Sequence, residues 1–167
     1  DLPGLRRREG RLEYVVVPAT YSGTGRSIVI TETDIDNVMR AKAALYAGVS
    51  TLLRLVDLDW PDLARVYVAG AFGRHVRLDQ AMAIGLFPEL KREKFCFLGN
   101  GSLQGAKLVA LDRSQAVKAR QIAARMENIE LTDNVLFGEE YMAALFLPHT
   151  DLSRFPRMHR LLERSVS

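Results

Sequence analysis

The run Val66-Tyr-Val-Ala-Gly-Ala-Phe-Gly73 decides the fold of this chain, because it is a short β-prone apolar strand that breaks on glycine. A second run of the same kind, Phe95-Cys-Phe-Leu-Gly-Asn-Gly101, follows further along the chain. The segment between them, residues 78–86, has helical character. Strand, glycine turn, helix and strand predict a parallel crossover. Its glycine turns would then lie at the sheet edge where open α/β folds bind ligands.

The two small-residue turns are therefore the candidate binding site. Glycine permits positive φ and lets a planar ring or a phosphate approach the backbone closely. Turns on adjacent parallel strands would lie side by side and form one groove. Each turn is also compatible with a plain strand-to-helix connection, in which Ser102 is only a helix N-cap. The candidate residues are Gly70, Ala71, Phe72, Gly73, Asn100, Gly101 and Ser102, and Arg74 and His75 directly after the first turn either contact the ligand or belong to the surface.

The N-terminal part predicts two antiparallel strands, 13–17 and 27–30, joined by a glycine loop, and then a helix over 34–56. Thr31 and Asp34 form the capping arrangement that starts this helix. Lys42 falls within the apolar stripe, where we favour a side chain that extends to solvent over one that reaches a ligand. The stripe predicts one buried face made of Ile35, Val38, Met39, Leu45, Val49, Leu52, Leu53 and Val56.

The C-terminal part predicts helices over 102–111, 114–126 and 136–147, with a short strand at 129–131. The small residues of the first of these helices should let it pack closely on the sheet. From Pro148 onward we expect a loop and then a short helix or an extension.

Composition indicates an ordinary globular protein of 167 residues with a net charge of +3. The charge is too small to suggest nucleic-acid binding, and the arginines at 6–8 and 11 suggest a solvated linker. We found no stretch that would span a membrane and no signal peptide. Cys96 is the one cysteine, which suggests a buried thiol in a reducing, cytoplasmic setting.

The residue pattern favours binding over catalysis. His75, His149 and His159 have no partners at metal-ligand spacing, so we expect no metal site. We also identify no Ser-His-Asp arrangement, nucleophile elbow or Walker phosphate loop, and hence no catalytic residue. The chain starts at Asp1 without a methionine, which suggests a piece of a longer protein.

Six motifs in a fixed order resemble the reductive activators of corrinoid proteins, over residues 28–156. They are Ile30-Thr-Glu-Thr-Asp-Ile35, Ala41-Lys-Ala-Ala-Leu-Tyr-Ala-Gly48, Val68-Ala-Gly-Ala-Phe-Gly73, Ala83-Ile-Gly-Leu-Phe-Pro88, Gly99-Asn-Gly-Ser-Leu-Gln-Gly-Ala106 and Leu147-Pro-His-Thr-Asp151. Several separate motifs in one order make the resemblance specific, whereas each alone would be weak.

The resemblance implies a three-layer, ribonuclease H-like α/β domain of the actin-like ATPase superfamily, with a mixed sheet covered by the helices at 34–56 and 102–111. Residues 13–156 would be the C-terminal half of this ATPase domain, 1–12 a linker and 157–167 a tail. Gly70 and Gly73 match the adenosine-motif glycines of the family, and Asn100, Gly101 and Ser102 match its second turn. These residues would line the adenosine end of bound ATP, with Mg²⁺. Arg74-His75 departs from the small-polar and aromatic pair expected there.

The resemblance further implies an oxidoreductase that restores cob(II)amide to cob(I)amide in a corrinoid protein of methyl transfer, at the expense of ATP. Its 2Fe-2S cluster would sit in a separate N-terminal domain absent from this chain, because such a cluster needs four thiolates. The first phosphate loop is also missing, so this piece alone should not hydrolyse ATP. The rival readings are a nucleotide-free interaction module on the same fold and part of a small-molecule kinase. A homodimer through regions absent here stays open.

Overall fold

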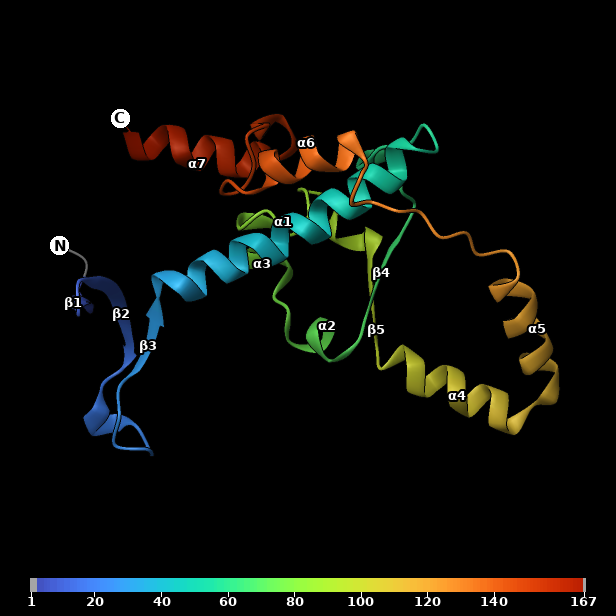
Figure 1. The fold of residues 1–167 in the computed structure, drawn as a ribbon, viewed down its shortest axis with the longest axis horizontal. Helices are drawn as coiled ribbons and strands as arrows, with labels where there is room; N and C mark the ends of the chain where they lie inside the picture. Colours follow the sequence, from blue (N-terminus) through green and yellow to red (C-terminus); the bar gives the residue numbers. More distant parts are fainter. Residues whose placement is uncertain (1–2, 167) are drawn as a thin grey trace.

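The computed structural model describes residues 3–166, apart from the side chains of Phe72, Arg74, Ser165 and Val166 (Figure 1). The element order is β1 (Leu5–Arg8), β2 (Arg11–Val17), η1 (Ala19–Tyr21), β3 (Ile28–Thr31), α1 (Glu32–Arg54), η2 (Trp60–Asp62), β4 (Val66–Ala69), α2 (Ala71–His75), α3 (Leu78–Ala83), η3 (Arg92–Lys94), β5 (Phe95–Gly99), α4 (Gly101–Leu111), α5 (Arg113–Ala123), α6 (Val135–Ala144), η4 (Leu152–Arg154) and α7 (Pro156–Val166).

Strands β4 and β5 form the parallel pair that the glycine-ended runs predict. Val66 pairs with Phe95 and Ala69 with Gly99, and the connection between the strands contains α2, α3 and η3. Parallel strands need such a crossover because a short hairpin cannot bring two strands into the same direction. The predicted crossover is therefore confirmed.

A second sheet contains β1, β2 and β3 in antiparallel order, which confirms the predicted hairpin between β2 and β3. Within the segment 1–12 that was expected to be a linker, residues 5–8 form β1, 9–10 a turn, and 11–12 the start of β2. Arg6 pairs with Glu13 across the two strands at 2.6 Å, and Leu5 lies opposite Tyr14. These cross-strand pairs hold the arginine-rich segment as a strand, while the four residues of β1 remain exposed as expected.

Helix α1 begins as expected, because Thr31 and Asp34 form a reciprocal capping box. Its predicted buried face is wrong. Five of the predicted residues, Ile35, Val38, Leu45, Leu52 and Val56, are 40–61% exposed. Helix α1 packs against α6. The buried residues of α1 are Lys42, Ala43, Tyr46, Ala47, Ser50 and Thr51. Alanine, serine and threonine on this face allow α6 to approach α1 closely, while the larger Tyr46 of the same face packs in the core beside Trp60.

The core lies where α1, α3, β4 and β5 meet the segment after α6. Its large members are Tyr46, Trp60, Phe87, Phe95 and Phe155, with partly buried Val66 and Val68 from β4 packed against them. Trp60 also donates its indole N–H to Ser50 Oγ at 2.8 Å, so the polar end of the ring is satisfied inside the core.

Helices α4 and α5 extend away from β4 and β5 (Figure 1). Residues 102–110 are all exposed, so α4 does not cover the sheet, although the sequence predicted that it would do so. Its apolar side chains are spread around the helix and give it no single stripe to bury. Residues 129–131 form no strand, in contrast to the sequence-based expectation. The C-terminal segment does end in a helix, α7. Within residues 3–166, each helix is too short or too polar to cross a membrane.

Candidate functional site

The two glycine turns lie side by side, as the sequence predicts. Ala69 and Gly99, the last residues of β4 and β5, are paired, and the Gly70 N–H donates to the Gly99 carbonyl oxygen at 2.6 Å. Gly70 has φ +95° and Gly99 has φ +67°, so both use the region that favours glycine. We did not name Gly99 as a candidate residue from the sequence, although a glycine at the end of a strand indicates a turn of this kind.

The first turn combines an open position with a closely packed one. A Cβ added at Gly70 would meet nothing within 4 Å, so the space above this residue is free. A Cβ at Gly73 would lie 3.0 Å from Val68 Cγ1 and 3.3 Å from the Val68 carbonyl oxygen. Gly73 therefore lets α2 pack on β4, whereas Gly70 faces open space. Ala71 is exposed, and the Phe72 side chain lies outside the described part.

The second turn opens α4. Asn100 Oδ1 accepts the Leu103 N–H at 3.0 Å, so Asn100 is the N-cap and Ser102 is an exposed residue of the first helical turn. The idea that Ser102 caps the helix is wrong, because the cap lies two residues earlier. Asn100 satisfies the Leu103 N–H of this first turn, and Gly101 lies next to the end of β4, since a Cβ added there would be 3.6 Å from Ala69 Cβ. Such an edge offers hydrogen-bond donors and a partial positive charge to a ligand.

This arrangement can hold a polar, flat ligand but supplies no proton-transfer group of its own. Residues 70–73 and 99–102 include no titratable side chain. His75, beyond the first turn, is exposed. Across the described residues, no group of three or more His, Cys, Asp or Glu side chains could hold a metal ion. The chemistry of the turns is therefore that of binding through the backbone.

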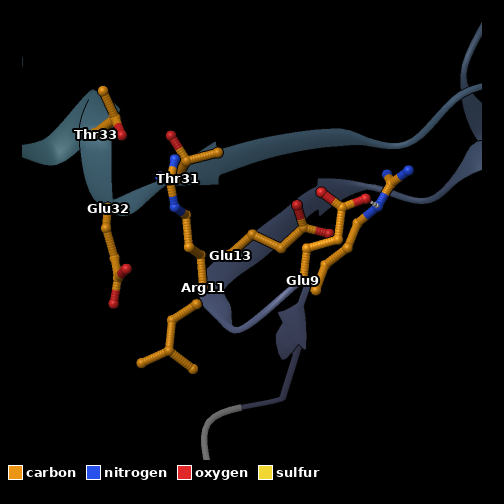
Figure 2. A pocket seen from close by; sticks show the side chains of 8 residues that line it. Glu9, Arg11, Glu13, Thr31, Glu32 and Thr33 are labelled. Carbon is orange, nitrogen blue, oxygen red and sulfur yellow. Dashed lines mark ion pairs between the residues drawn. The ribbon is translucent and has the colours of Figure 1, made fainter.

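Three surface hollows of the described chain are lined by other residues. The one in Figure 2 has a volume of about 530 Å³ and lies between the β1–β2 turn and the start of α1. Its walls carry both signs of charge, since Arg8 lies 4.0 Å from Glu9 and Glu13 is paired with Arg6. A second hollow lies between α3 and α7, and a third beside η2 and η4. These three hollows include no residue of the two turns, so the candidate site rests on the backbone geometry of the turns.

Lys42 is a structural residue of the core. Its side chain is 1% exposed, and Nζ donates to the carbonyl oxygens of Phe146 and, at 2.7 Å, Pro148. The expectation that Lys42 extends to solvent is wrong, because these two carbonyl groups need a donor inside the core. Burial lowers the pKa of Lys42 from 10.5 to about 8.

Stability should therefore rise with pH between pH 8 and pH 10. In that window Lys42 loses its proton in the folded state, while the unfolded chain keeps it. The free energy of unfolding should increase by about 2 kcal/mol. Urea denaturation of the full-length protein at several pH values would measure this rise, and Lys42→Met should remove it. An equal rise in the variant would assign the effect to other groups.

An ionic cluster surrounds the buried Glu140 on α6, and sequence reasoning missed it. The Glu140 carboxylate contacts the guanidinium group of Arg154, lies 3.3 Å from Arg54 Nη2, and has His149 Nε2 at 3.7 Å. The Asp151 N–H donates to His149 Nδ1 at 2.9 Å, so the neutral ring carries its proton on Nε2, toward Glu140. His149 therefore belongs to this ionic cluster and has a structural role, and it is not part of the two turns.

The comparisons with known proteins point to one group of proteins. The family described as the C-terminal domain of RACo, the ASKHA domain, matches residues 1–159. The chain is 33% identical over 129 residues to the corrinoid activation enzyme RamQ of Eubacterium limosum. This alignment covers 77% of this chain and 22% of that protein. It is 28% identical over 123 residues to a Co(II) methylated amine-specific corrinoid protein reductase of Methanosarcina barkeri, covering 72% of this chain and 23% of the relative.

A solved structure, described as the reductive activator for a corrinoid, iron-sulfur protein, has the same fold. It matches with a TM-score of 0.85 and 43% identity, over 92% of this chain and 24% of the other. The chain thus spans less than a quarter of the length of each of these relatives.

Proposed function

The chain belongs to the family of the C-terminal domain of RACo, the ASKHA domain, and from this premise we propose that it is part of an ATP-dependent reductive activator of a corrinoid protein. It has the actin-like α/β fold of that family. The intact activator would return cob(II)amide to cob(I)amide in a corrinoid protein of methyl transfer. One electron from a reduced 2Fe-2S cluster, held in another domain of the intact protein, would reduce Co(II) to Co(I).

Within this activity, we assign the two turns to the adenosine end of bound ATP. Gly70 and Gly99 bring the backbone of both strands to one open edge, where the Gly70 N–H meets the Gly99 carbonyl at 2.6 Å. This juxtaposition carries the proposal, because a planar base and a ribose need close approach to a backbone without side chains. Ala71, Phe72, Gly101 and Ser102 belong to the same edge. Gly73 packs closely against Val68 of β4 and so holds α2 on the strand. Mg²⁺ and the phosphates would be held by residues of the intact protein outside this chain.

We also propose the setting of the intact protein. Its partner is a corrinoid protein, and we expect neither nucleic acid nor a membrane to take part. The single cysteine, Cys96, is free and only half-buried, not fully buried as expected, and it fits a cytoplasmic protein under reducing conditions. A homodimer would form through regions outside this chain.

Nucleotide binding by the intact protein tests the adenosine assignment. Gly70→Asn keeps the positive φ, which asparagine tolerates, and fills the open space with a side chain. We expect ATP affinity to fall by at least about tenfold in calorimetry, a loss of about 1.4 kcal/mol. Gly25→Asn is the matched control, since Gly25 also has positive φ, +68°, with nothing within 4 Å, in the β2–β3 loop.

The outcomes separate the proposal from its rivals. No binding by the unaltered protein would favour an interaction module on the same fold, and equal affinity in both variants would remove the turns from the site. The reducing activity needs a separate measurement. With ATP and a low-potential electron donor, the cob(II)amide absorption of the partner should give way to that of cob(I)amide, and a failure of this change would contradict the activator role.

A further inference from the structure

The three-stranded sheet carries an apolar outer face, which we define as Leu5, Tyr14, Ile28 and Ile30. Leu5 lies opposite Tyr14, and Tyr14 lies opposite Ile30, so these three share one face of the sheet. Strand alternation adds Ile28 to the same face. Each of the four side chains is 42–52% exposed.

The sequence of β3 indicates that this face is covered in the working protein. Ile28-Val-Ile30 is a continuous apolar run, with Val29 half-buried on the opposite face. An antiparallel strand with one face in water normally alternates apolar and polar residues, whereas a continuous run is typical of strands covered on both faces. A row of exposed apolar side chains across three strands is also a common sign of an interaction site.

The charges beside the outer face are positive. Arg7, two residues after Leu5, lies on the same face opposite Leu12, and the exposed Arg26 precedes Ile28 in the loop. Residues 3–31 contain two carboxylates, neither of which belongs to this face. Glu13 is on the opposite face, paired with Arg6 at 2.6 Å, and Glu9 is in the β1–β2 turn, 4.0 Å from Arg8. An apolar centre with tyrosine and flanking arginines is typical of protein–protein interfaces, and its complement is apolar and acidic.

The position of the sheet suits a docking site. Figure 1 shows the three strands at the N-terminal end of α1, well apart from β4 and β5. A partner on the outer face would therefore leave the Gly70 and Gly99 turns free for nucleotide. The sheet joins α1 directly, since Thr31 ends β3 and caps the helix. The docked partner and the core would thus share α1 as a common support.

We propose that the outer face docks an acidic, apolar surface of the corrinoid protein. This inference rests on the proposed function and deepens it by naming the surface that holds the partner. Arg7 and Arg26 pair with carboxylates of the corrinoid protein, and the four outer-face side chains bury against its apolar residues.

The test uses the full-length activator and its corrinoid protein. Ile30→Glu should weaken their complex by at least about tenfold in calorimetry. Arg7→Glu should weaken it as well and make its Kd less dependent on salt. ATP affinity should stay unchanged in both variants. The matched control is Val135→Glu, at an apolar residue of α6 that is 74% exposed and away from the sheet. Partner affinity within twofold of the unaltered protein in both variants would overturn the docking site while leaving the proposed function intact.

A crosslink decides the case if Ile30→Glu fails to fold. A photoreactive phenylalanine analogue at position 14 preserves the aromatic ring and reports what covers it. A crosslink from this position to the corrinoid protein supports the proposal. A crosslink only within the activator shows that the activator's own chain covers the outer face, and this overturns it. If the unaltered protein does not bind the corrinoid protein at all, both the docking site and the proposed function fail.

Discussion

Replacing Gly85 with alanine is expected to destabilise the fold by about 3 to 5 kcal/mol. Gly85 has φ +78° and follows α3, where the Leu86 N–H donates to Ala81 and the Gly85 N–H to Met82 in a Schellman motif. A Cβ at this position would lie 2.0 Å from the Pro148 carbonyl oxygen. The alanine therefore meets both an unfavourable backbone conformation and a clash with backbone.

The clash cannot relax cheaply, because the Pro148 carbonyl is held from its other side. Lys42 Nζ donates to this oxygen at 2.7 Å, and Phe146 is tied to the same amine. Moving the carbonyl away from position 85 would strain these bonds or leave a buried amine without an acceptor. The substitution therefore destabilises the core, because no flexible loop can move to relieve the clash.

Calorimetry of the full-length protein would measure this effect as a fall of about 10 °C in the melting temperature of this domain. Gly105→Ala is the matched control, since Gly105 lies inside α4 without positive φ and with nothing within 4 Å. Alanine there should be neutral or stabilise by up to about 1 kcal/mol. If Gly85→Ala melts at the temperature of the unaltered protein, the contact with Pro148 is not a real constraint.

Local patterns predicted the parts of the fold that local chemistry determines. The glycine-ended strands gave the parallel crossover, because each strand and its turn lie within eight residues. Thr31 and Asp34 likewise gave the start of α1, since a capping box joins residues three positions apart. The adjacency of the two turns followed from the crossover, and so the candidate site could be located before its geometry was known.

Long-range contacts decided what the sequence could not reveal. The pattern of α1 predicted a buried face of large aliphatic residues, but long-range packing buries the side with Ala43, Tyr46 and Ala47. Lys42 is satisfied by carbonyl groups 104 and 106 residues away, which no periodicity can report. The same holds for the clash at Gly85, since Pro148 is close only in the folded chain. For Lys42 and Gly85 the contact is made by a backbone carbonyl, which side-chain patterns cannot reveal.

Loss of the Glu140 charge is the second large effect that we expect. Burial raises the pKa of this carboxyl group, but the nearby His149 imidazole and the guanidinium groups of Arg154 and Arg54 lower it further, so that it falls from 4.5 to about 2. Glu140→Gln keeps the shape of the side chain and removes its charge. Among the described residues, the half-buried Arg154 then keeps Asp151 as its ionic partner, at 3.2 Å. We expect a loss of about 3 kcal/mol, as for other buried pairs that lose one partner.

The sign of the pH dependence distinguishes this charge effect from a mere change in packing. Because the folded pKa of Glu140 is depressed, its stabilisation is fully present above pH 4.5 and is lost as pH falls toward 2. Glu140→Gln should therefore differ from the unaltered protein by about 3 kcal/mol at pH 6 and converge with it near pH 2.

Asp34, Asp112 and Glu130 also have lowered pKa values, so the readout is the difference between the two proteins, which cancels these three contributions. The pKa of Asp151 is lowered as well, first by its hydrogen bond with Ser153, and Asp151 shares Arg154 with Glu140, so its contribution belongs to the measured charge effect. Glu9→Gln, at an exposed carboxylate 4.0 Å from Arg8, is the control and should change stability by less than about 0.5 kcal/mol. Denaturant titrations from pH 2 to pH 6 supply the curves. Parallel curves for the unaltered protein and Glu140→Gln would mean that shape, and not charge, makes Glu140 matter, and the ionic cluster would then contribute nothing to the stability of the core.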